Sequence, residues 1–338
     1  MRYLHVQDNK MKFKSVIIIL SAVTLTVLTS CHKDNGESGG LPYLDGSVTF
    51  DIPKFVSLGQ ELNLTPKGIK NPTGDLGYYW YSSWKTAKDT VKTETGPGDG
   101  SWTVSVPVAI GTYSITAGAF AEDYYGSTCE KSFTVVDASL NGTITGAGYQ
   151  SDSVKLVDPR DGGVYYLATS GGNVWMQNNL YYSGSGVSYE NSPAMDQAVG
   201  RLYSWNEAMT ACPEGWHLPS DADFAALAEA NVGKGETFTD AAGPLMADAH
   251  FNGFKMWTFW PDVKITNKAK FSAMPIGYAI DQEGTRKYVG INEYATFWTS
   301  DENGENGLYR YIFVSKNDIF CSNGDKGSFL ASVRCVKD

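Results

Sequence analysis

The segment at 200–224, GRLYSWNEAMTACPEGWHLPSDADF, constrains the fold of this chain more than any other stretch. Ser204 stands three residues before Glu207, a spacing that predicts a capping box, in which each side chain binds the free backbone N–H of the other residue. Ser220 and Asp223 repeat this arrangement at the start of a second predicted helix. Apolar residues recur at helical spacing around the first cap: Leu202, Trp205, Met209 and Cys212. We therefore expect two short, capped helices in succession.

Strand patterns dominate the rest of 154–338. A hairpin is predicted at 164–177, and aromatic or alternating stretches follow the helices at 254–260, 271–279, 288–291, 295–300, 308–314 and 329–336. Helices early and strands late are typical of an α+β domain. We expect such a domain over 154–338.

The part that precedes this domain reads as all-β. Between residues 44 and 137, short alternating segments separated by Pro and Gly turns stand at 47–52, 61–65, 78–81, 102–106, 111–117 and 131–136. Their number and spacing predict a β-sandwich. Nothing in 44–137 is typical of a catalytic site, so we expect a spacer module. The Gly-, Ser- and Thr-rich segment 138–153 is predicted to be a linker.

The beginning of the chain predicts export. Lys12 and Lys14 precede an apolar run that ends in LTSC, the arrangement of a secretory signal over 1–31, with Met11 as the start that fits it. The run is marginal for the ~20 apolar residues that a membrane span needs. The ending resembles the lipobox of bacterial lipoproteins, whose cysteine is diacylated and becomes the mature N-terminus. The resemblance implies lipidation of Cys31 and stable membrane anchoring.

The segment behind that cysteine, 32–43, is mostly polar and Gly-rich and is predicted to be a flexible tether. Asp34 and Glu37 resemble the surface-export signal of Bacteroidetes lipoproteins. This resemblance implies an outer-membrane lipoprotein of a Gram-negative bacterium, displayed at the cell surface. Thr90 and Ser153 stand in triplets that resemble the O-glycosylation motif of exported Bacteroidetes proteins.

Composition and missing motifs narrow the function. The net charge is −10, whereas nucleic-acid binding needs a basic patch, so no nucleic-acid partner is expected. The sequence has no HExxH, no zinc-ligand spacing, no nucleophile elbow and no phosphate loop. We therefore predict that the protein is not an enzyme and has no obligatory cofactor. The four cysteines other than Cys31 allow three pairings in an oxidising compartment.

The motifs NVWMQNNLYY, GRLYSWNEAMTACPEGWHLPSDADFAAL, ATFWTSDE and SVRCVKD, in this order, resemble the FISUMP domain, the Fibrobacter succinogenes major paralogous domain, over 154–338. That family is found in exported bacterial proteins and is similar to the C-type lectin-like fold. The resemblance implies a disulfide between an early helix and the last strand, and so pairs Cys212 with Cys335. Cys129 is then a free thiol, and Cys321 pairs with it only if the domains dock. Residues 44–137 are similar to PKD-like and bacterial Ig-like modules.

One segment carries candidate ligand residues: Trp298, Asp301, Glu302, Asn303, Glu305 and Asn306. The lectin-like fold binds calcium and sugar around a Trp-Asn-Asp strand in this region, but this chain has Trp-Thr-Ser. An oxygen-rich loop can hold calcium, with Asp301 and Glu305 as candidate ligands, and a solvated turn explains the same residues. Seven aromatic residues can either stack on a glycan or peptide or form the core: Trp257, Trp260, Tyr278, Tyr288, Tyr294, Tyr309 and Tyr311.

Together these patterns predict a non-enzymatic, surface-anchored lipoprotein whose lectin-like domain binds carbohydrate or a host or cell-surface protein. The main alternative is a tip-type subunit of a fimbrial or adhesin assembly. A further alternative is an accessory protein of glycan degradation, or a formylglycine-type enzyme with Cys321 and Cys335 as its reactive thiols.

Overall fold

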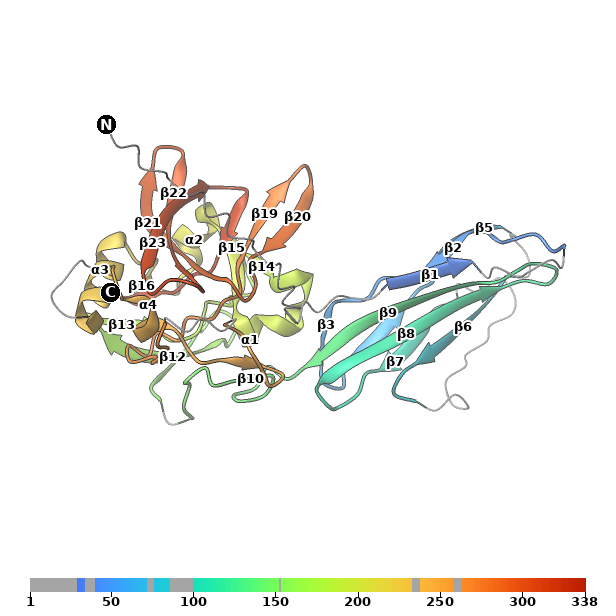
Figure 1. Ribbon diagram of the computed structural model, residues 1–338, viewed down its shortest axis with the longest axis horizontal. Helices are drawn as coiled ribbons and strands as arrows, with labels where there is room; N and C mark the ends of the chain where they lie inside the picture. Colours follow the sequence, from blue (N-terminus) through green and yellow to red (C-terminus); the bar gives the residue numbers. More distant parts are fainter. Residues whose placement is uncertain are drawn as a thin grey trace, which may run out of the picture.

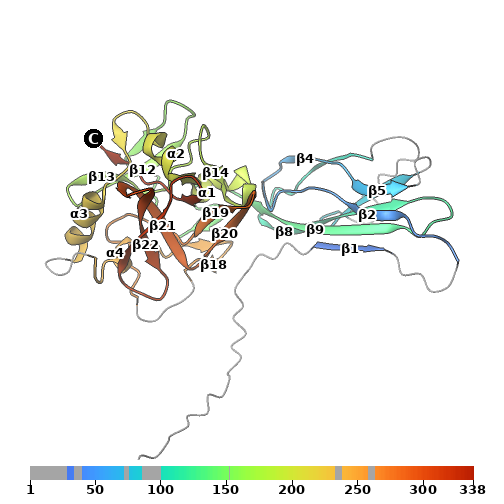
Figure 2. The ribbon, with the colours of Figure 1, turned by 90° about the horizontal axis from the view of Figure 1, so that it is seen from above.

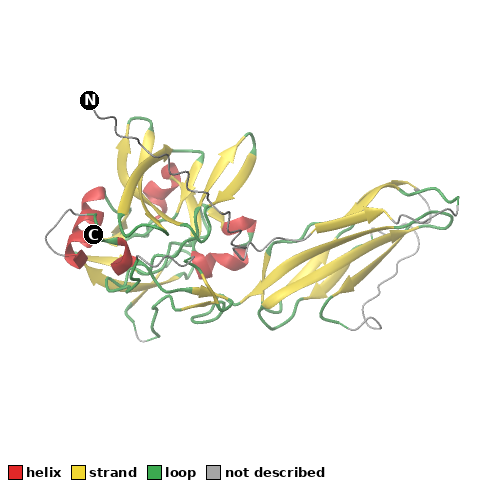
Figure 3. Cartoon of the chain, in the orientation of Figure 1, coloured by secondary structure: helices red, strands yellow, loops and turns green. Residues whose placement is uncertain are grey.

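The computed structural model describes residues 29–33, 40–71, 76–85, 100–151, 153–232, 238–257 and 263–338, with backbone only for 29–33 and 71. Figure 1 and Figure 2 show two bodies lying end to end. The N-terminal body comprises the described residues up to 136, and the C-terminal body those from 137 onward. Figure 3 places the helices in the C-terminal body, and strands dominate both, so the protein is a β-rich, multidomain chain.

The N-terminal body is built from strands alone. They are β1 (Thr29–Lys33), β2 (Asp45–Thr49), β3 (Phe55–Ser57), β4 (Glu61–Leu64), β5 (Lys67–Asn71), β6 (Gly77–Ser82), β7 (Trp102–Ser105), β8 (Gly111–Phe120) and β9 (Ser127–Val136). The main sheet has the order β1-β9-β8-β6, with β3 parallel to β9, while β2 pairs with β5 and β4 with β7. Because strand side chains alternate between faces, every second residue of β4 and β7 is buried. These side chains join one apolar core around the stacked rings of Trp80 and Trp102.

The beginning of the described chain is part of this body. Of the predicted signal, 1–31, only the last three residues are described, and they form the start of β1. Of the predicted tether, His32 and Lys33 end β1, and Tyr43 forms an isolated bridge with Tyr125. Residues 34–39 lie outside the described part. Both ends of 32–43 therefore belong to the fold, unlike the free tether that the composition predicts.

The C-terminal body mixes short helices with small sheets. Its helices are η1 (Tyr189–Asn191), η2 (Pro193–Met195), α1 (Asp196–Val199), α2 (Trp205–Ala211), α3 (Asp221–Val232) and α4 (Ala242–Leu245). Its strands are β10 (Ile144–Thr145), β11 (Lys155–Val157), β12 (Val164–Ser170), β13 (Asn173–Met176), β14 (Val187–Ser188), β15 (Arg201–Ser204), β16 (Trp216–His217), β17 (His250–Phe251), β18 (Phe254–Lys255), β19 (Tyr278–Gln282), β20 (Thr285–Val289), β21 (Tyr294–Asn303), β22 (Asn306–Phe313), β23 (Ile319–Asp325), β24 (Phe329–Ala331) and β25 (Val336–Lys337).

These strands form sheets of the order β11-β12-β13-β25-β16, β14-β15-β24-β19-β20, β21-β22-β23 and β10-β17-β18. The last strand, β25, lies between β13 and β16, and β24 lies between β15 and β19. Strands from both ends of the body thus share its two larger sheets. Within the part of the chain that the structure describes, none of the helices has the length and apolarity to cross a membrane.

Both predicted helix starts are present. The Glu207 N–H donates to Ser204 Oγ at 3.3 Å, and the Ser204 N–H donates to the Glu207 carboxylate at 2.9 Å. Ser220 and Asp223 make the same two bonds at the start of α3. The predicted apolar face of the first helix is wrong at two positions. Leu202 lies in β15 before the helix begins, and Met209 is 44 % exposed.

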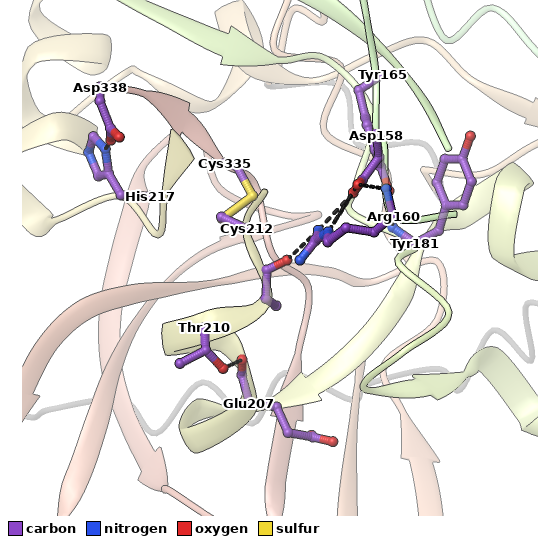
Figure 4. Close-up of a disulfide and its surroundings, with 11 residues drawn as sticks. Asp158, Arg160, Tyr165, Tyr181, Glu207, Thr210, Cys212, His217, Cys335 and Asp338 are labelled. Atoms are coloured by element: carbon purple, nitrogen blue, oxygen red, sulfur yellow. Dashed lines mark hydrogen bonds and ion pairs between the residues drawn. A yellow bond between two sulfur atoms is a disulfide. The ribbon is translucent and has the colours of Figure 1, made fainter. Parts of the chain in front are cut away.

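Cys212 and Cys335 form a disulfide, which confirms the predicted pair (Figure 4). Cys212 caps the C-terminus of α2, and Cys335 directly precedes β25. Their Cα atoms are 5.8 Å apart, across a sequence separation of 123. The bond therefore ties the early helical segment to the last strand.

The other cysteines differ in part from the prediction. Cys129 is fully buried in β9 and disulfide-bonded, so the expected free thiol at this position is wrong. In the ladder between β1 and β9, the residue opposite Cys129 is Cys31. Cys321 is exposed and free, and hence does not pair with Cys129.

The segment predicted as a linker, 138–153, packs against the C-terminal body. Its strand β10 pairs with β17, and Thr143 is fully buried. The ring of Tyr149 stacks on Tyr166 of β12 at a centroid distance of 5.2 Å and an interplanar angle of 5°. Its glycines and small residues thus allow close packing here.

Candidate functional site

The sheet β21-β22-β23 has one face that is mostly aromatic and carries a single charged residue, Glu302 at the hairpin end. Tyr294 lies opposite Phe313, Thr296 opposite Tyr311, and Trp298 opposite Tyr309. Directly opposed residues of antiparallel strands share a face, and every second residue along a strand returns to it. The register therefore assigns eleven residues to this face: Tyr294, Thr296, Trp298, Glu302, Gly307, Tyr309, Tyr311, Phe313, Phe320, Ser322 and Gly324. The alternate face carries Phe297 and Ile312, which pack into the core with α3.

Aromatic rings on this face form a closed cycle of contacts with β19 and β24. Centroid distances are 6.1 Å from Tyr278 to Tyr294, 6.0 Å from Tyr294 to Tyr311 and 5.9 Å from Tyr311 to Tyr309. Phe329 closes the cycle by stacking on Tyr309 at 4.7 Å and on Tyr278 at 5.0 Å. Such offset and edge-on pairs stabilise one another beyond their burial, so the cycle is a preorganised surface.

Most of these rings keep one part in solvent. We name the half-buried set the aromatic face; it consists of Tyr278, Tyr294, Tyr309, Tyr311, Phe313 and Phe320. Trp298 and Phe329 lie beneath it with exposures of 0 % and 8 %. Beside it, Val289 is directly opposite Tyr278, and both Val289 and Ile291 are exposed. The aromatic face is thus the centre of a larger apolar surface.

Four phenol hydroxyls accompany the rings. Among the described residues, the hydroxyls of Tyr278, Tyr294, Tyr309 and Tyr311 make no hydrogen bond, so water or a ligand must satisfy them. Burial raises the pKa of Tyr278 and of Tyr311, and the neighbouring phenols raise both further. These two hydroxyls are therefore protonated at neutral pH and can donate as well as accept.

The residues predicted as a ligand loop form the end of a β-hairpin instead. Trp298 is fully buried, and its indole N–H donates to the carbonyl oxygen of Tyr203 at 2.8 Å, so it belongs to the core. Asp301 accepts a hydrogen bond from the Asp221 backbone at the start of α3 at 2.6 Å. Glu302 pairs with Lys326 at 2.5 Å.

The remaining members of the predicted set lie at the hairpin turn. Asn303 and Asn306 are paired across it, and Glu305 is exposed beside Gly304. In the described part of the chain, no group of three or more His, Cys, Asp or Glu side chains could hold a metal ion. Because Asp301 binds α3 whereas Glu305 points from the turn, these residues offer no common calcium site.

Of the two predicted glycosylation positions, Thr90 lies outside the described residues. Ser153 is half-buried just before β11.

The two thiols of the formylglycine-type alternative, Cys321 and Cys335, are not available as a reactive pair. Cys335 is buried in its disulfide, and burial raises the pKa of the remaining thiol, Cys321, which keeps it protonated.

A small cavity of about 50 Å³ lies where the segment after β9 meets the C-terminal body. Its walls include Asp137, Tyr149, Tyr166, Asn178 and Gln197. This is room for a few water molecules, and the cavity is much smaller than ordinary ligand pockets. The aromatic face is therefore the better candidate site.

Comparison with protein families agrees with the resemblance seen in the sequence. The model of the Fibrobacter succinogenes major domain matches residues 169–337, half of the chain. The chain therefore belongs to this family. The match begins inside β12, later than position 154, where the motifs place the start of the domain. No curated protein matches the chain.

Proposed function

We propose that this protein is a non-enzymatic, surface-anchored outer-membrane lipoprotein of a Bacteroidetes-type bacterium. An N-terminal PKD- or Ig-like β-sandwich carries a lectin-like domain that binds carbohydrate. The aromatic face supports the binding function, because half-exposed rings are combined there with hydroxyls that lack protein partners. Apolar patches of this kind mark interaction sites on soluble domains.

Carbohydrate fits this surface better than a charged partner does. A sugar ring offers apolar C–H groups that can lie on aromatic rings, and hydroxyls that can bind the phenols. The register leaves Glu302, at the hairpin end, as the one charged residue on this face of β21, β22 and β23, and Lys326 already pairs with it. A protein ligand for the same surface would need complementary apolar side chains.

Alanine at Tyr294 or Tyr311 is expected to weaken glycan binding by about 10- to 100-fold, as loss of a central aromatic contact does in other interfaces. The measurement is a glycan array with the detergent-extracted full chain, followed by titration of each glycan retained. Phenylalanine at Tyr311 keeps the ring and tests the hydroxyl alone.

Tyr81→Ala is the matched control, because Tyr81 is a comparably exposed aromatic residue (39 %) on β6 of the other body. Glycan binding that survives alanine at both Tyr294 and Tyr311 would contradict the site. No binding to any glycan, together with co-purification in a filament, would favour the assembly-subunit alternative.

Lipidation of Cys31 is a separate prediction and concerns a side chain outside the described ones. An alkyne-tagged fatty acid supplied to cells should label the wild-type protein, and Cys31→Ser should abolish the label. Cys129, the residue opposite Cys31 in the β1–β9 ladder, is disulfide-bonded in the structure. A thioether-linked lipid leaves no thiol for a disulfide, so lipidation of Cys31 and a bridge from Cys31 to Cys129 exclude each other. An intact mass that shows an unlipidated Cys31 would refute the anchor.

A further inference from the structure

The two bodies meet through an apolar side chain from β3. Phe55 is 4 % exposed and packs in one cluster with Val136, Tyr189 and residues of the C-terminal body. Its ring lies 5.9 Å from Phe251 and 6.3 Å from Tyr189, measured between centroids. Its backbone N–H donates to Ser192 Oγ at 3.2 Å, and Ser192 is fully buried. This junction is therefore packed as a small core and not as a loose contact between surfaces.

An ion pair stands beside this apolar contact. Lys54 Nζ lies 2.9 Å from Glu190 Oε1, and the side chains are only 24 % and 27 % exposed. Glu190 and Asn191 both have left-handed backbone, with φ of 51° and 54°. That conformation is strained for glutamate, so contacts on the segment must hold it in place. Lys54 supplies such a contact from the N-terminal body.

The second contact on the strained segment comes from the β19–β20 hairpin. The Tyr288 hydroxyl accepts from the Asn191 N–H at 3.2 Å and donates to the Ser188 carbonyl oxygen at 3.0 Å. The Tyr288 ring meets Tyr189 edge-on at 5.3 Å. Phe55, Tyr189 and Tyr288 thus form a row of three rings from β3 to β20.

The same hairpin supplies one side of the aromatic face. Tyr288 is paired with Ala279, and the next pair, Tyr278 with Val289, points to the opposite face of the two strands. In Figure 1 and Figure 2 the hairpin lies on the side of the C-terminal body that faces the N-terminal body. One face of β19–β20 therefore packs on the junction segment, while the other presents Tyr278 to Tyr294 and Phe329.

We propose that the N-terminal body is part of the binding unit: through Phe55, Lys54 and the junction segment 188–192, it positions the β19–β20 hairpin and so completes the aromatic face. The role of the N-terminal body in ligand binding rests on the function proposed above, whereas its positioning of the hairpin does not. Edge hairpins with few neighbours open locally at a low cost in free energy. Contacts of the N-terminal body and segment 188–192 with one face of the hairpin, here called the brace, therefore raise the fraction of molecules in which the other face is formed.

Hydrogen–deuterium exchange on the full chain tests the brace without any ligand. Phe55→Ala should speed exchange of the amides in 278–289 by at least about tenfold, in line with the loss of a buried aromatic side chain, while β21–β23 change little. Tyr288→Phe keeps the ring but removes the hydroxyl bonds, and should speed exchange in the same hairpin. Lys54→Ala should do so by about twofold, as expected for a partly exposed ion pair.

Lys67→Ala is the matched control, because Lys67 pairs with Asp51 in the same body at an exposed position away from the junction. It should leave the hairpin unchanged. Unchanged hairpin exchange in Phe55→Ala, with faster exchange confined to 188–192, would overturn the proposal. If Phe55→Ala does not fold, Tyr288→Phe and Lys54→Ala decide it: faster hairpin exchange in both supports the brace, and unchanged exchange in both overturns it.

A ligand titration separates this proposal from the binding function. If the aromatic face binds glycan, Phe55→Ala should weaken binding severalfold although no residue of the face is altered. If no glycan binds the wild type, the proposed function is wrong. Hydrogen–deuterium exchange then still decides whether the N-terminal body positions the hairpin.

Discussion

Removing the disulfide between Cys212 and Cys335 should lower the free energy of unfolding of the C-terminal body by about 5 kcal/mol. The bond closes a loop with a sequence separation of 123, and in the chain-entropy model a loop of this size restricts the unfolded chain by that amount. For a body of this size the melting temperature should fall by about 10 °C. The measurement compares thermal and urea unfolding of a Cys212→Ala/Cys335→Ala double variant with the wild type.

The double variant avoids leaving one reactive thiol unpaired. Cys321→Ala is its control, because this exposed thiol is free and its removal should change the melting temperature little. Unfolding should be followed by a signal from the C-terminal body alone, since a chain with two bodies need not unfold in one step. A double variant with the same melting temperature as the wild type with its disulfide intact would contradict the prediction.

Replacing Arg334 by methionine should destabilise the C-terminal body by more than about 4 kcal/mol. Arg334 is fully buried, and its guanidinium donates to Asn179 Oδ1 at 2.8 Å and to the Met176 and Ser272 carbonyl oxygens at 3.2 Å each. It also donates to the carbonyl oxygen of Phe271. None of these acceptors is a carboxylate, and burial lowers the pKa of Arg334 to about 10.

The expected loss of stability comes from the oxygen atoms that accept hydrogen bonds from Arg334. Methionine would leave four buried oxygens without a donor, at about 1–3 kcal/mol each, and relief of the buried charge would offset only part of this. Arg334→Lys keeps a charge but loses the planar fork that reaches several acceptors, so it should restore stability only in part. Urea unfolding measures both variants.

Arg286→Met is the matched control on the surface, where Arg286 pairs with Asp281 at 2.7 Å and both side chains are partly exposed. Its loss should cost less than about 1 kcal/mol. An Arg334→Met variant within that range would show that the buried guanidinium is not required for stability.

Local patterns predicted the local structure well. Both capping boxes are present because they join residues three apart, whose geometry depends little on the rest of the chain. The same locality explains the errors. Met209 follows the helical spacing but is exposed, because helical periodicity does not specify which face the body will cover. The pairing of Cys212 with Cys335 followed from family resemblance, since spacing alone left three pairings open.

The candidate site was beyond sequence reasoning for a different reason. The aromatic residues were visible in the sequence, but whether each lies in the core or at the surface depends on strand register. Trp298 and Tyr309 are directly opposed and both contact Phe329, yet the first is fully buried and the second half-buried. Trp298 also binds the Tyr203 carbonyl oxygen of β15, a contact that the strand pattern does not specify. Two carboxylates of the predicted ligand loop, Asp301 and Glu302, are likewise engaged by α3 and Lys326, which are distant in sequence.

By itself the sequence determined the succession of elements: a β-rich first part, two capped helices, a strand-rich end, and membership of the family through motifs in a recognisable order. The tertiary structure decided which side chains meet. The aromatic cycle joins 278 to 329, the row of rings joins 55 to 288, and Arg334 joins segments at 176, 179 and 271–272. Such contacts depend on how sheets and bodies pack, and packing is a property of the whole chain that no local pattern encodes.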